Sequence, residues 1–234
     1  MLRPEPGAAA TLARAHDAGF HPVGAPLFRM VPLAWTPPPS DRYDALMLTS
    51  ANAVRWAGEG LRSCHRLPAY AVGTATADSA RSHGFSTVRS GDADAAALLE
   101  LMVKDGVARP LHLCGRDHRP VDHAQLTITH LPVYAAEAVT DLPDTAWKAL
   151  NEGAIALVHS PRAAEVLAAV LARAGIERAT VRLAAISPAA AAAAGEGWEE
   201  VAIADQPTDG ALLAAAARLC EEGDPAPSGA TQTP

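Results

Sequence analysis

One pattern occurs twice in the chain, as AVGTATADSARSHG at residues 71–84 and as AISPAAAAAAGEG at residues 185–197. In each copy a short apolar run ends at a small residue, and an alanine-rich stretch follows. This order is typical of a buried parallel strand that leads through a sharp turn into a helix. A Leu-Leu pair follows each copy at the same distance, at residues 98–99 and 212–213. The repeat therefore predicts two similar lobes.

A second pair of segments indicates how the lobes are connected. LMLTSANAV at residues 46–54 resembles ALVHSPRAA at residues 156–164. GAPLFRM ends at Met30 and HLPVYAAE ends at Glu137, and both are typical of a strand that leaves a lobe. The chain would enter the middle lobe after the first of these strands and leave it after the second. The first lobe is therefore predicted to be discontinuous.

The predicted fold class is α/β, with two similar lobes, each a five-stranded mostly parallel sheet flanked by helices, joined by a two-strand linker. The groove between the lobes is the expected binding site. The predicted boundaries are residues 1–33 plus 137–222 for the first lobe, 38–131 for the inserted second lobe, 34–37 and 132–136 for the linkers, and 223–234 for a disordered tail. Strands are expected near 1–3, 22–28, 154–159, 182–186 and 200–204 in the first lobe, and near 44–49, 69–73, 86–90, 110–114 and 127–133 in the second.

Composition narrows the class of protein. The chain has 234 residues, 49% of them hydrophobic and only 4% aromatic, which fits two lobes packed largely through small side chains. A net charge of −7 argues against a nucleic-acid partner, because phosphate binding needs a basic stripe and stacking aromatic side chains. No apolar stretch is long enough to cross a membrane, and the N-terminus lacks the pattern of a signal peptide. A cytoplasmic protein without a membrane partner is expected.

Cysteine and histidine form no recognisable metal or disulfide pattern. Cys64, Cys114 and Cys220 are odd in number and far apart, so they are predicted to be buried small hydrophobic residues. The nine histidines include no HExxH sequence and no close Cys/His cluster, so no metal ligand is assigned. Surface or capping roles are predicted for the histidines that fall in one stretch, which are His112, His118, His123 and His130.

Many strand candidates end in residues that suit the start of a helix. Helix starts offer free backbone N–H groups and the positive end of the helix dipole, so several of them facing one groove would form an anion receptor. Ligands of open α/β sheets bind at the carboxyl ends of strands, which is where these turns are expected. Simple N-capping is the alternative for any single residue. The residues are Thr49, Ser50, Gly73, Thr74, Gly91, Ser160, Ser187 and Thr208.

Motifs of two large enzyme classes are missing. Neither Gly73 nor Gly91 begins a GxGxxG or a GxxxxGK(S/T) sequence, which argues against NAD and ATP sites. Neither Ser50 nor Ser160 lies in a GxSxG sequence, which argues against a serine hydrolase.

An ordered set of short motifs resembles the uroporphyrinogen-III synthase family over nearly the whole chain. No single motif is specific, but their order combined with the discontinuous two-lobe layout is much more so. The resemblance implies two α/β lobes joined by a two-stranded linker. The motifs are RPEP at residues 3–6, LTSANAV at 48–54, AVGTATA at 71–77, RSGDADA at 89–95, LCGR at 113–116, LPVY at 131–134, HSPRAA at 159–164, AISP at 185–188 and QPTDGAL at 206–212.

The resemblance also implies a reaction without cofactor or metal. Linear hydroxymethylbilane would be cyclised with inversion of ring D and loss of water, through a spiro intermediate, to uroporphyrinogen III. Catalysis would act mainly by positioning this flexible substrate. Hydroxymethylbilane synthase is expected to hand over the substrate transiently, and the chain is expected to be a monomer.

Site residues follow from the same resemblance. Tyr134 in LPVY is the implied proton donor to the departing hydroxyl, with packing between the lobes as the alternative role. Thr76 matches the hydroxyl of the family's first glycine turn. Arg3 and Arg116 are implied partners of substrate carboxylates, and Asn52 is assigned to substrate binding with its neighbours in LTSANAV.

Two other functions stay open at the level of sequence. A non-catalytic two-lobe protein that closes on a small anion would share the hinge and the crossing linkers. A degenerate synthase-like domain with a regulatory role is the second. It is suggested by the turn at residues 187–190, which reads SPAA where the family often has glycine followed by hydroxyl residues.

Overall fold

The structure, a computed structural model, describes residue 2 and residues 7–91 and 94–222. The chain divides into two compact units. We call Met30–Glu137 the inserted unit, and Met1–Arg29 together with Ala138–Pro234 the split unit. The boundaries fall within strands β1 (Phe28–Pro32) and β6 (Thr129–Ala138), which are neighbours in one sheet. No helix in the described ranges is both long and apolar enough to span a membrane.

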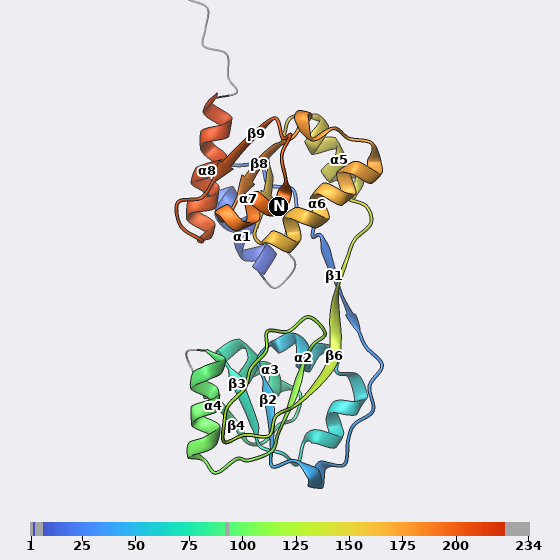
Figure 1. Ribbon diagram of the computed structural model, residues 1–234, viewed down its shortest axis with the longest axis vertical. Helices are drawn as coiled ribbons and strands as arrows, with labels where there is room; N and C mark the ends of the chain where they lie inside the picture. Colours follow the sequence, from blue (N-terminus) through green and yellow to red (C-terminus); the bar gives the residue numbers. More distant parts are fainter. Residues whose placement is uncertain (1, 3–6, 92–93, 223–234) are drawn as a thin grey trace, which may run out of the picture. The chain divides into compact units, whose positions relative to one another are not determined.

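The inserted unit is built on a six-stranded sheet with the strand order β1-β6-β5-β2-β3-β4 (Figure 1). Every neighbouring pair from β6 to β4 is parallel. The chain lays down β2, β3 and β4 in one direction and then returns to add β5 and β6 on the other side of β2. The strand order therefore reverses between β2 and β5, which is the kind of position where open α/β sheets bind ligands. The bounds are β2 (Ala45–Leu48), β3 (Ala69–Val72), β4 (Val88–Gly91) and β5 (Pro110–Gly115).

Both faces of this sheet are covered. In β2, Leu46 and Leu48 belong to one core cluster, whereas Ala45 and Met47 belong to a second cluster on the opposite face. Burial on both faces explains why β2 is a continuous apolar run. The first face is covered by α2 (Ala51–Trp56), η2 (Gly58–Cys64) and α3 (Thr74–Ser82). The second face is covered by α4 (Ala95–Lys104). A short helix, η1 (Ser40–Arg42), precedes β2.

The split unit has a smaller parallel sheet with the order β7-β8-β9. Leu157 and Ala184 on one face pack against side chains of α1 and α8. Helices α6 and α7 pack against each other and against β7 and β8, through faces rich in alanine (Figure 1). The bounds are α1 (Gly7–Asp17), α5 (Asp144–Asn151), β7 (Ala156–Val158), α6 (Pro161–Ala174), η3 (Arg178–Thr180), β8 (Arg182–Ala185), α7 (Pro188–Ala194), β9 (Glu200–Ile203) and α8 (Asp209–Glu222).

The predicted α/β class with a mainly parallel sheet flanked by helices is confirmed, but the prediction of five strands in each lobe is wrong. All five strands predicted for the second lobe are present as β2 to β6, and β1 extends their sheet to six strands. In the split unit the described residues form a sheet of only three. The strand expected near residues 1–3 and the tail at 223–234 fall outside the described residues, apart from Leu2.

The strand expected near residues 22–28 is absent because of its prolines. Pro22 and Pro26 have no N–H to donate, and strand pairing is recorded only from Phe28 onward. Leu27 still makes isolated backbone bonds, donating to Leu2 O at 3.2 Å and accepting from the Val139 N–H at 2.9 Å. The segment is therefore held in place by single bonds and is not part of a ladder.

Candidate functional site at the carboxyl edge of the inserted sheet

Most of the predicted site residues lie at the carboxyl ends of the parallel strands in the inserted unit. Because β5, β2, β3 and β4 are neighbours in the sheet, the turns that follow them are neighbours at one edge of it. Tyr134 lies within β6, level with this edge, because it is the register partner of Gly115 at the end of β5. The reversal of strand order between β2 and β5 lies at the centre of this edge. Along it, the residues come in the order Tyr134, Arg116, then Thr49, Ser50 and Asn52, then Gly73, Thr74 and Thr76, then Gly91.

The turn after β2 begins a short helix with a capped start. Ser50 is the N-cap of α2, and its Oγ accepts the backbone N–H of Asn52 at 3.2 Å. Thr49 Oγ1 lies 3.0 Å from Nε2 of His112 on the neighbouring strand β5. Both hydroxyls predicted to bind substrate therefore already have protein partners. An anion at this turn would rely on backbone N–H groups.

The turn after β3 depends on a glycine. Gly73 has a φ of +73°, and a Cβ at this position would meet no atom within 4 Å, so the backbone conformation and not crowding requires glycine. The Gly73 N–H donates to Gly91 O at 3.0 Å and thereby joins the turns after β3 and β4. Thr74 at the start of α3 is exposed, whereas Thr76 is only 6% exposed. Thr74 is therefore the more accessible hydroxyl of this turn.

Tyr134 lies against the turn that follows β5. A Cβ on Gly115 would come within 2.9 Å of Tyr134 Cζ, so the missing side chain of Gly115 makes room for the phenol ring. The Arg116 N–H donates to Tyr134 O at 2.8 Å, which fixes the backbone of this turn to β6. The Arg116 side chain is exposed, and its Nε is 3.7 Å from Asp117 Oδ1, a loose ion pair of little energetic worth.

Ser160, Ser187 and Thr208 lie in the split unit, where all three cap helices. Ser160 and Ser187 follow the adjacent strands β7 and β8, and each precedes a proline at the first helical position, where a missing N–H costs nothing. In the structure these side chains therefore act as N-caps, which is the alternative role considered for them in the sequence. Their hydroxyl oxygens accept backbone N–H groups of Ala163 at 3.1 Å, Ala190 at 3.2 Å and Ala211 at 3.2 Å, respectively.

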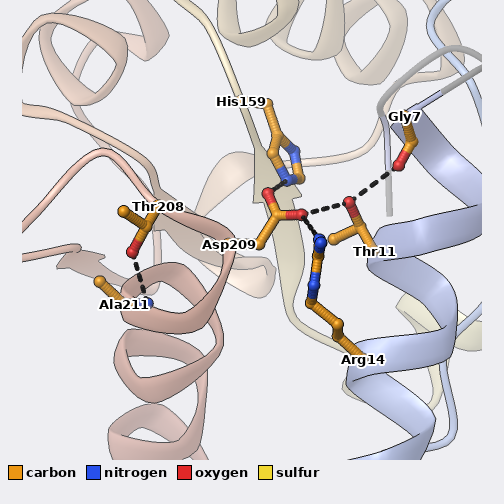
Figure 2. Close-up of polar contacts among 7 residues, drawn as sticks. All are labelled: Gly7, Thr11, Arg14, His159, Thr208, Asp209 and Ala211. Carbon is orange, nitrogen blue, oxygen red and sulfur yellow. Dashed lines mark hydrogen bonds and ion pairs between the residues drawn. The ribbon is translucent and has the colours of Figure 1, made fainter. Parts of the chain in front are cut away.

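Figure 2 shows a polar network around Asp209 that sequence reasoning missed. The carboxylate accepts the Thr11 hydroxyl at 2.7 Å and the Arg14 guanidinium at 2.6 Å, and Nε2 of His159 lies 3.5 Å away. Both Asp209 and His159 are nearly buried, with side chains 11% and 9% exposed. The network joins α1, the end of β7 and the start of α8. His159 belongs to the motif HSPRAA and Asp209 to QPTDGAL, but the sequence contains no signal that pairs segments so far apart.

Two of the cysteines and histidines, Cys220 and His112, differ from their predicted environments. Cys64 and Cys114 are buried as predicted, but Cys220 is exposed. His112 is only 1% exposed because it lies in the middle of β5, in register with Met47 of β2, so the predicted surface or capping role is wrong for it. The sequence contains no close Cys/His motif, but His112, Cys114, His118 and His130 gather in space.

Arg3 falls outside the described residues. A cavity of about 220 Å³ in the split unit is lined by apolar side chains such as Phe20, Leu150 and Leu213, with Arg182 at its border. It lies at the amino end of β8, opposite to the edge where such sheets bind ligands, and its apolar lining does not suit an anion.

Comparisons with known proteins bear on the whole chain. The family model described as uroporphyrinogen-III synthase HemD matches residues 9–214. A search of curated proteins gave no match. The solved uroporphyrinogen-III synthetase of Helicobacter pylori is 18% identical, with a TM-score of 0.53 over 82% of this chain and 91% of that chain. The uroporphyrinogen III synthase of Thermus thermophilus is also 18% identical, with a TM-score of 0.38 over 95% of this chain and 99% of that chain. Because the family model covers most of the sequence, the chain belongs to the uroporphyrinogen-III synthase family.

Proposed function

We propose that the chain cyclises hydroxymethylbilane with inversion of ring D and loss of water and releases uroporphyrinogen III. The observation that carries this proposal is the family match over residues 9–214. The carboxyl edge of the inserted sheet supports it, because several helix starts and an exposed arginine lie side by side there. Both reacting atoms belong to the substrate and water is the leaving group, so the proposed reaction needs no resident cofactor.

Recognition of the substrate carboxylates is proposed to rest mainly on backbone N–H groups. The first N–H groups of a helix have no partner within the helix and lie at the positive end of its dipole. The side-chain hydroxyls of Ser50, Ser160 and Ser187 are used as caps and hold these helix starts in place. Arg116 adds an exposed guanidinium at the same edge as Ser50, and Arg3 remains a predicted second cation.

Tyr134 is proposed to assist departure of the hydroxyl group. Its ring is half-buried against Gly115, so the phenol has a defined position. A phenolic O–H can donate a proton or a hydrogen bond to an oxygen that leaves. Thr76 is a weaker candidate for the same task because it is nearly buried, and the exposed Thr74 is better placed to contact a ligand.

The setting of the reaction is also a proposal. The chain works as a monomer in the cytoplasm and receives its substrate by transient hand-over from hydroxymethylbilane synthase. Rapid capture would matter because the free substrate is expected to close without enzyme to the uninverted type I isomer.

Isomer analysis tests the proposed function directly. Purified protein is supplied with freshly made hydroxymethylbilane, and the porphyrins are separated as type I and type III isomers after oxidation. We expect mainly type III product, formed faster than in a protein-free control. Type I product alone, at the rate of that control, would overturn the proposal. Retention of hydroxymethylbilane without turnover would instead identify the non-catalytic binding protein.

A further inference from the structure

Four side chains with metal-binding atoms gather beside the carboxyl edge of the inserted sheet. His112 and Cys114 lie two residues apart on β5, so they project from the same face. His130 on β6 is the register partner of His112, and His118 lies just after β5. One ligand atom from each residue lies within 4.8 Å of all the others. The pairing of β5 with β6 thus assembles a cluster that is scattered in the sequence.

The hydrogen bonds around the cluster leave suitable atoms pointing inward. Nδ1 of His118 lies 3.0 Å from the carbonyl oxygen of Gly115, and an N–H donated there leaves Nε2 with its lone pair. Nε2 of His112 can donate in the same way to Thr49 Oγ1 at 3.0 Å, which leaves the lone pair of Nδ1 directed at His130, where an ion could replace the hydrogen bond between the two rings. Metal-bound histidines nearly always donate their other ring N–H to such an oxygen. Two of the three histidines, His112 and His118, therefore have the outer partner expected at a metal site.

Separations within the cluster fit a small tetrahedral ion. With Zn–N bonds of about 2.1 Å and Zn–S bonds of about 2.3 Å, ligand atoms on one ion are separated by about 3.4–3.7 Å. Nδ1 of His112 and Nδ1 of His130 are 3.0 Å apart, slightly closer than that. The other separations are at most 4.8 Å, so small side-chain rotations suffice.

Burial shifts the pKa of three members of the cluster. Burial and the neighbouring His130 lower the pKa of His112 to about 3, and burial lowers the pKa of His130. Burial raises the pKa of the Cys114 thiol to about 11, an effect that the Leu131 backbone N–H partly opposes.

We propose that His112, Cys114, His118 and His130 form a structural binding site for a divalent transition metal of the zinc class. One thiolate and three imidazoles, without a carboxylate, favour such an ion over magnesium or calcium. Four protein ligands fill a tetrahedral shell and leave no open position for substrate, which is the pattern of a structural site. The ion would join β5, β6 and the turn at residues 115–118, and would hold Arg116 and Gly115 in place beside Tyr134. This proposal does not rest on the proposed reaction.

Cobalt(II) is the probe that tests this proposal. Chelator-treated protein is titrated with Co²⁺, and we expect one ion per chain, with strong tetrahedral absorption bands, a sulfur-to-cobalt charge-transfer band, and displacement by Zn²⁺. The charge-transfer band should vanish in Cys114→Ser. His118→Asn should weaken binding by more than about 100-fold, because loss of an outer partner alone typically costs about 10–100-fold. Thr49→Val removes such an outer partner and should fall within that range.

Matched controls separate this cluster from other thiols and imidazoles. Cys220→Ser removes an exposed thiol, and His123→Asn removes a histidine five positions after His118 that lies outside the cluster. Both should bind Co²⁺ like the wild type. Zn²⁺ should raise the thermal unfolding midpoint of the wild type and of both controls but not that of His118→Asn.

X-ray absorption on the zinc-loaded wild type decides the case even if Cys114→Ser fails to fold. We expect a shell of one sulfur and three nitrogens. A shell without sulfur, or a charge-transfer band that persists in folded Cys114→Ser, would overturn the proposal. Absence of any Co²⁺ spectrum would show that the cluster is held by hydrogen bonds alone, with the Nδ1–H of one histidine donating to the other.

Discussion

Tyr134 and Gly115 illustrate at the scale of single residues how the candidate site is positioned. The phenol occupies space that any side chain on residue 115 would fill, and the backbone bond from Arg116 to Tyr134 holds the two strands together at this point. The register between β5 and β6 also shifts between Cys114 and Gly115, which places Tyr134 opposite Gly115. A local irregularity thus sets the position of the proposed acid.

Replacement of Tyr134 by phenylalanine tests the proposed acid. General-acid assistance is typically worth about 10²–10⁴ in rate, and the hydroxyl leaves readily without help, so we expect kcat to fall by at most about 10²-fold. The product should remain mostly type III because substrate folding decides which carbon attacks. Tyr43→Phe is the matched control, since Tyr43 packs against the same core. Wild-type kcat in folded Tyr134→Phe would assign this residue to packing alone.

At the scale of elements, the starts of helices are the main proposed binding groups. Ser50→Ala, Ser160→Ala and Thr208→Ala should each lower the free energy of unfolding by about 1 kcal/mol, the usual worth of a cap. Their effects on kcat/KM should be small, because the backbone N–H groups remain. Denaturant titration and steady-state kinetics on the same samples check both statements.

Gly73→Val should be much more damaging to activity than the cap variants. Its matched control is Gly58→Val, because both glycines have positive φ, +73° and +65°, and a Cβ on either meets no atom within 4 Å. Each substitution should destabilise the fold by about 1–2 kcal/mol or more through backbone strain. Only Gly73 lies at the carboxyl edge of the sheet, so only its variant should lose kcat/KM strongly. Equal losses of activity in both would contradict a receptor at this turn.

Replacement of Asp209 tests how much its network, which joins α1, the end of β7 and α8, contributes to the free energy of unfolding. Asp209→Ala removes the nearly buried carboxylate that accepts from Thr11 and Arg14, but Thr11 keeps Gly7 O as an acceptor at 3.0 Å and the Arg14 side chain is 58% exposed. We therefore expect a loss of about 1–2 kcal/mol in the free energy of unfolding. Asp205→Ala is the control: its side chain is 85% exposed, its ion pair with Arg218 is 3.8 Å long, and its loss should cost under about 0.5 kcal/mol. A similar cost for both variants in chemical denaturation would show that the network contributes little.

Tyr70 and Asp105 give the structure a predictable response to pH. Tyr70 Oη donates to Asp105 Oδ2 at 2.9 Å, and Arg89 makes bonds of 3.1 and 2.7 Å to the same carboxylate. Burial, followed by this hydrogen bond, raises the pKa of Tyr70 to about 12, and the hydrogen bond from Tyr70 lowers the pKa of Asp105. The folded state therefore binds the tyrosine proton more tightly than the unfolded chain does. It binds the aspartate proton more weakly than the unfolded chain does.

Stability is lost with rising pH at the alkaline end of the scale and with falling pH at the acid end. The contribution of Tyr70 is fully present below its ordinary pKa of 10.0 and is lost as pH rises through about 12. The contribution of Asp105 is present above its ordinary pKa of 3.8 and is lost as pH falls through its lower folded value. Tyr70→Phe should thus be less stable than the wild type near pH 7, and this difference should shrink above about pH 10. A difference that stays constant in urea titrations across this range would refute the linkage.

At the scale of the whole molecule, the sequence predicts local units well and long-range pairings poorly. Each strand of the inserted sheet is a short apolar run before a turn, and for that reason β2 to β6 were predictable. The segment at 22–28 looks equally apolar, but its prolines cannot donate to a ladder. The turns at Ser50 and Gly73 were likewise predictable because cap and glycine chemistry is local. The cluster around His112 and the network around Asp209 depend on which strands and helices become neighbours, and neither spacing nor composition contains that information.

Because the two units have separate cores, we expect a destabilising core substitution in one unit to leave the stability of the other unit unchanged. Leu46 in the inserted unit and Leu183 in the split unit are both 0% exposed, and truncation of a buried leucine to alanine typically costs about 2–5 kcal/mol. Hydrogen exchange measured by mass spectrometry on the full chain should show faster exchange within residues 30–137 for Leu46→Ala, and within 1–29 and 138–222 for Leu183→Ala. Each variant is the control of the other, because the chemistry and burial of the deleted group are the same. If either substitution raises exchange equally in both ranges, the units unfold together, and the cores must be treated as one cooperative structure.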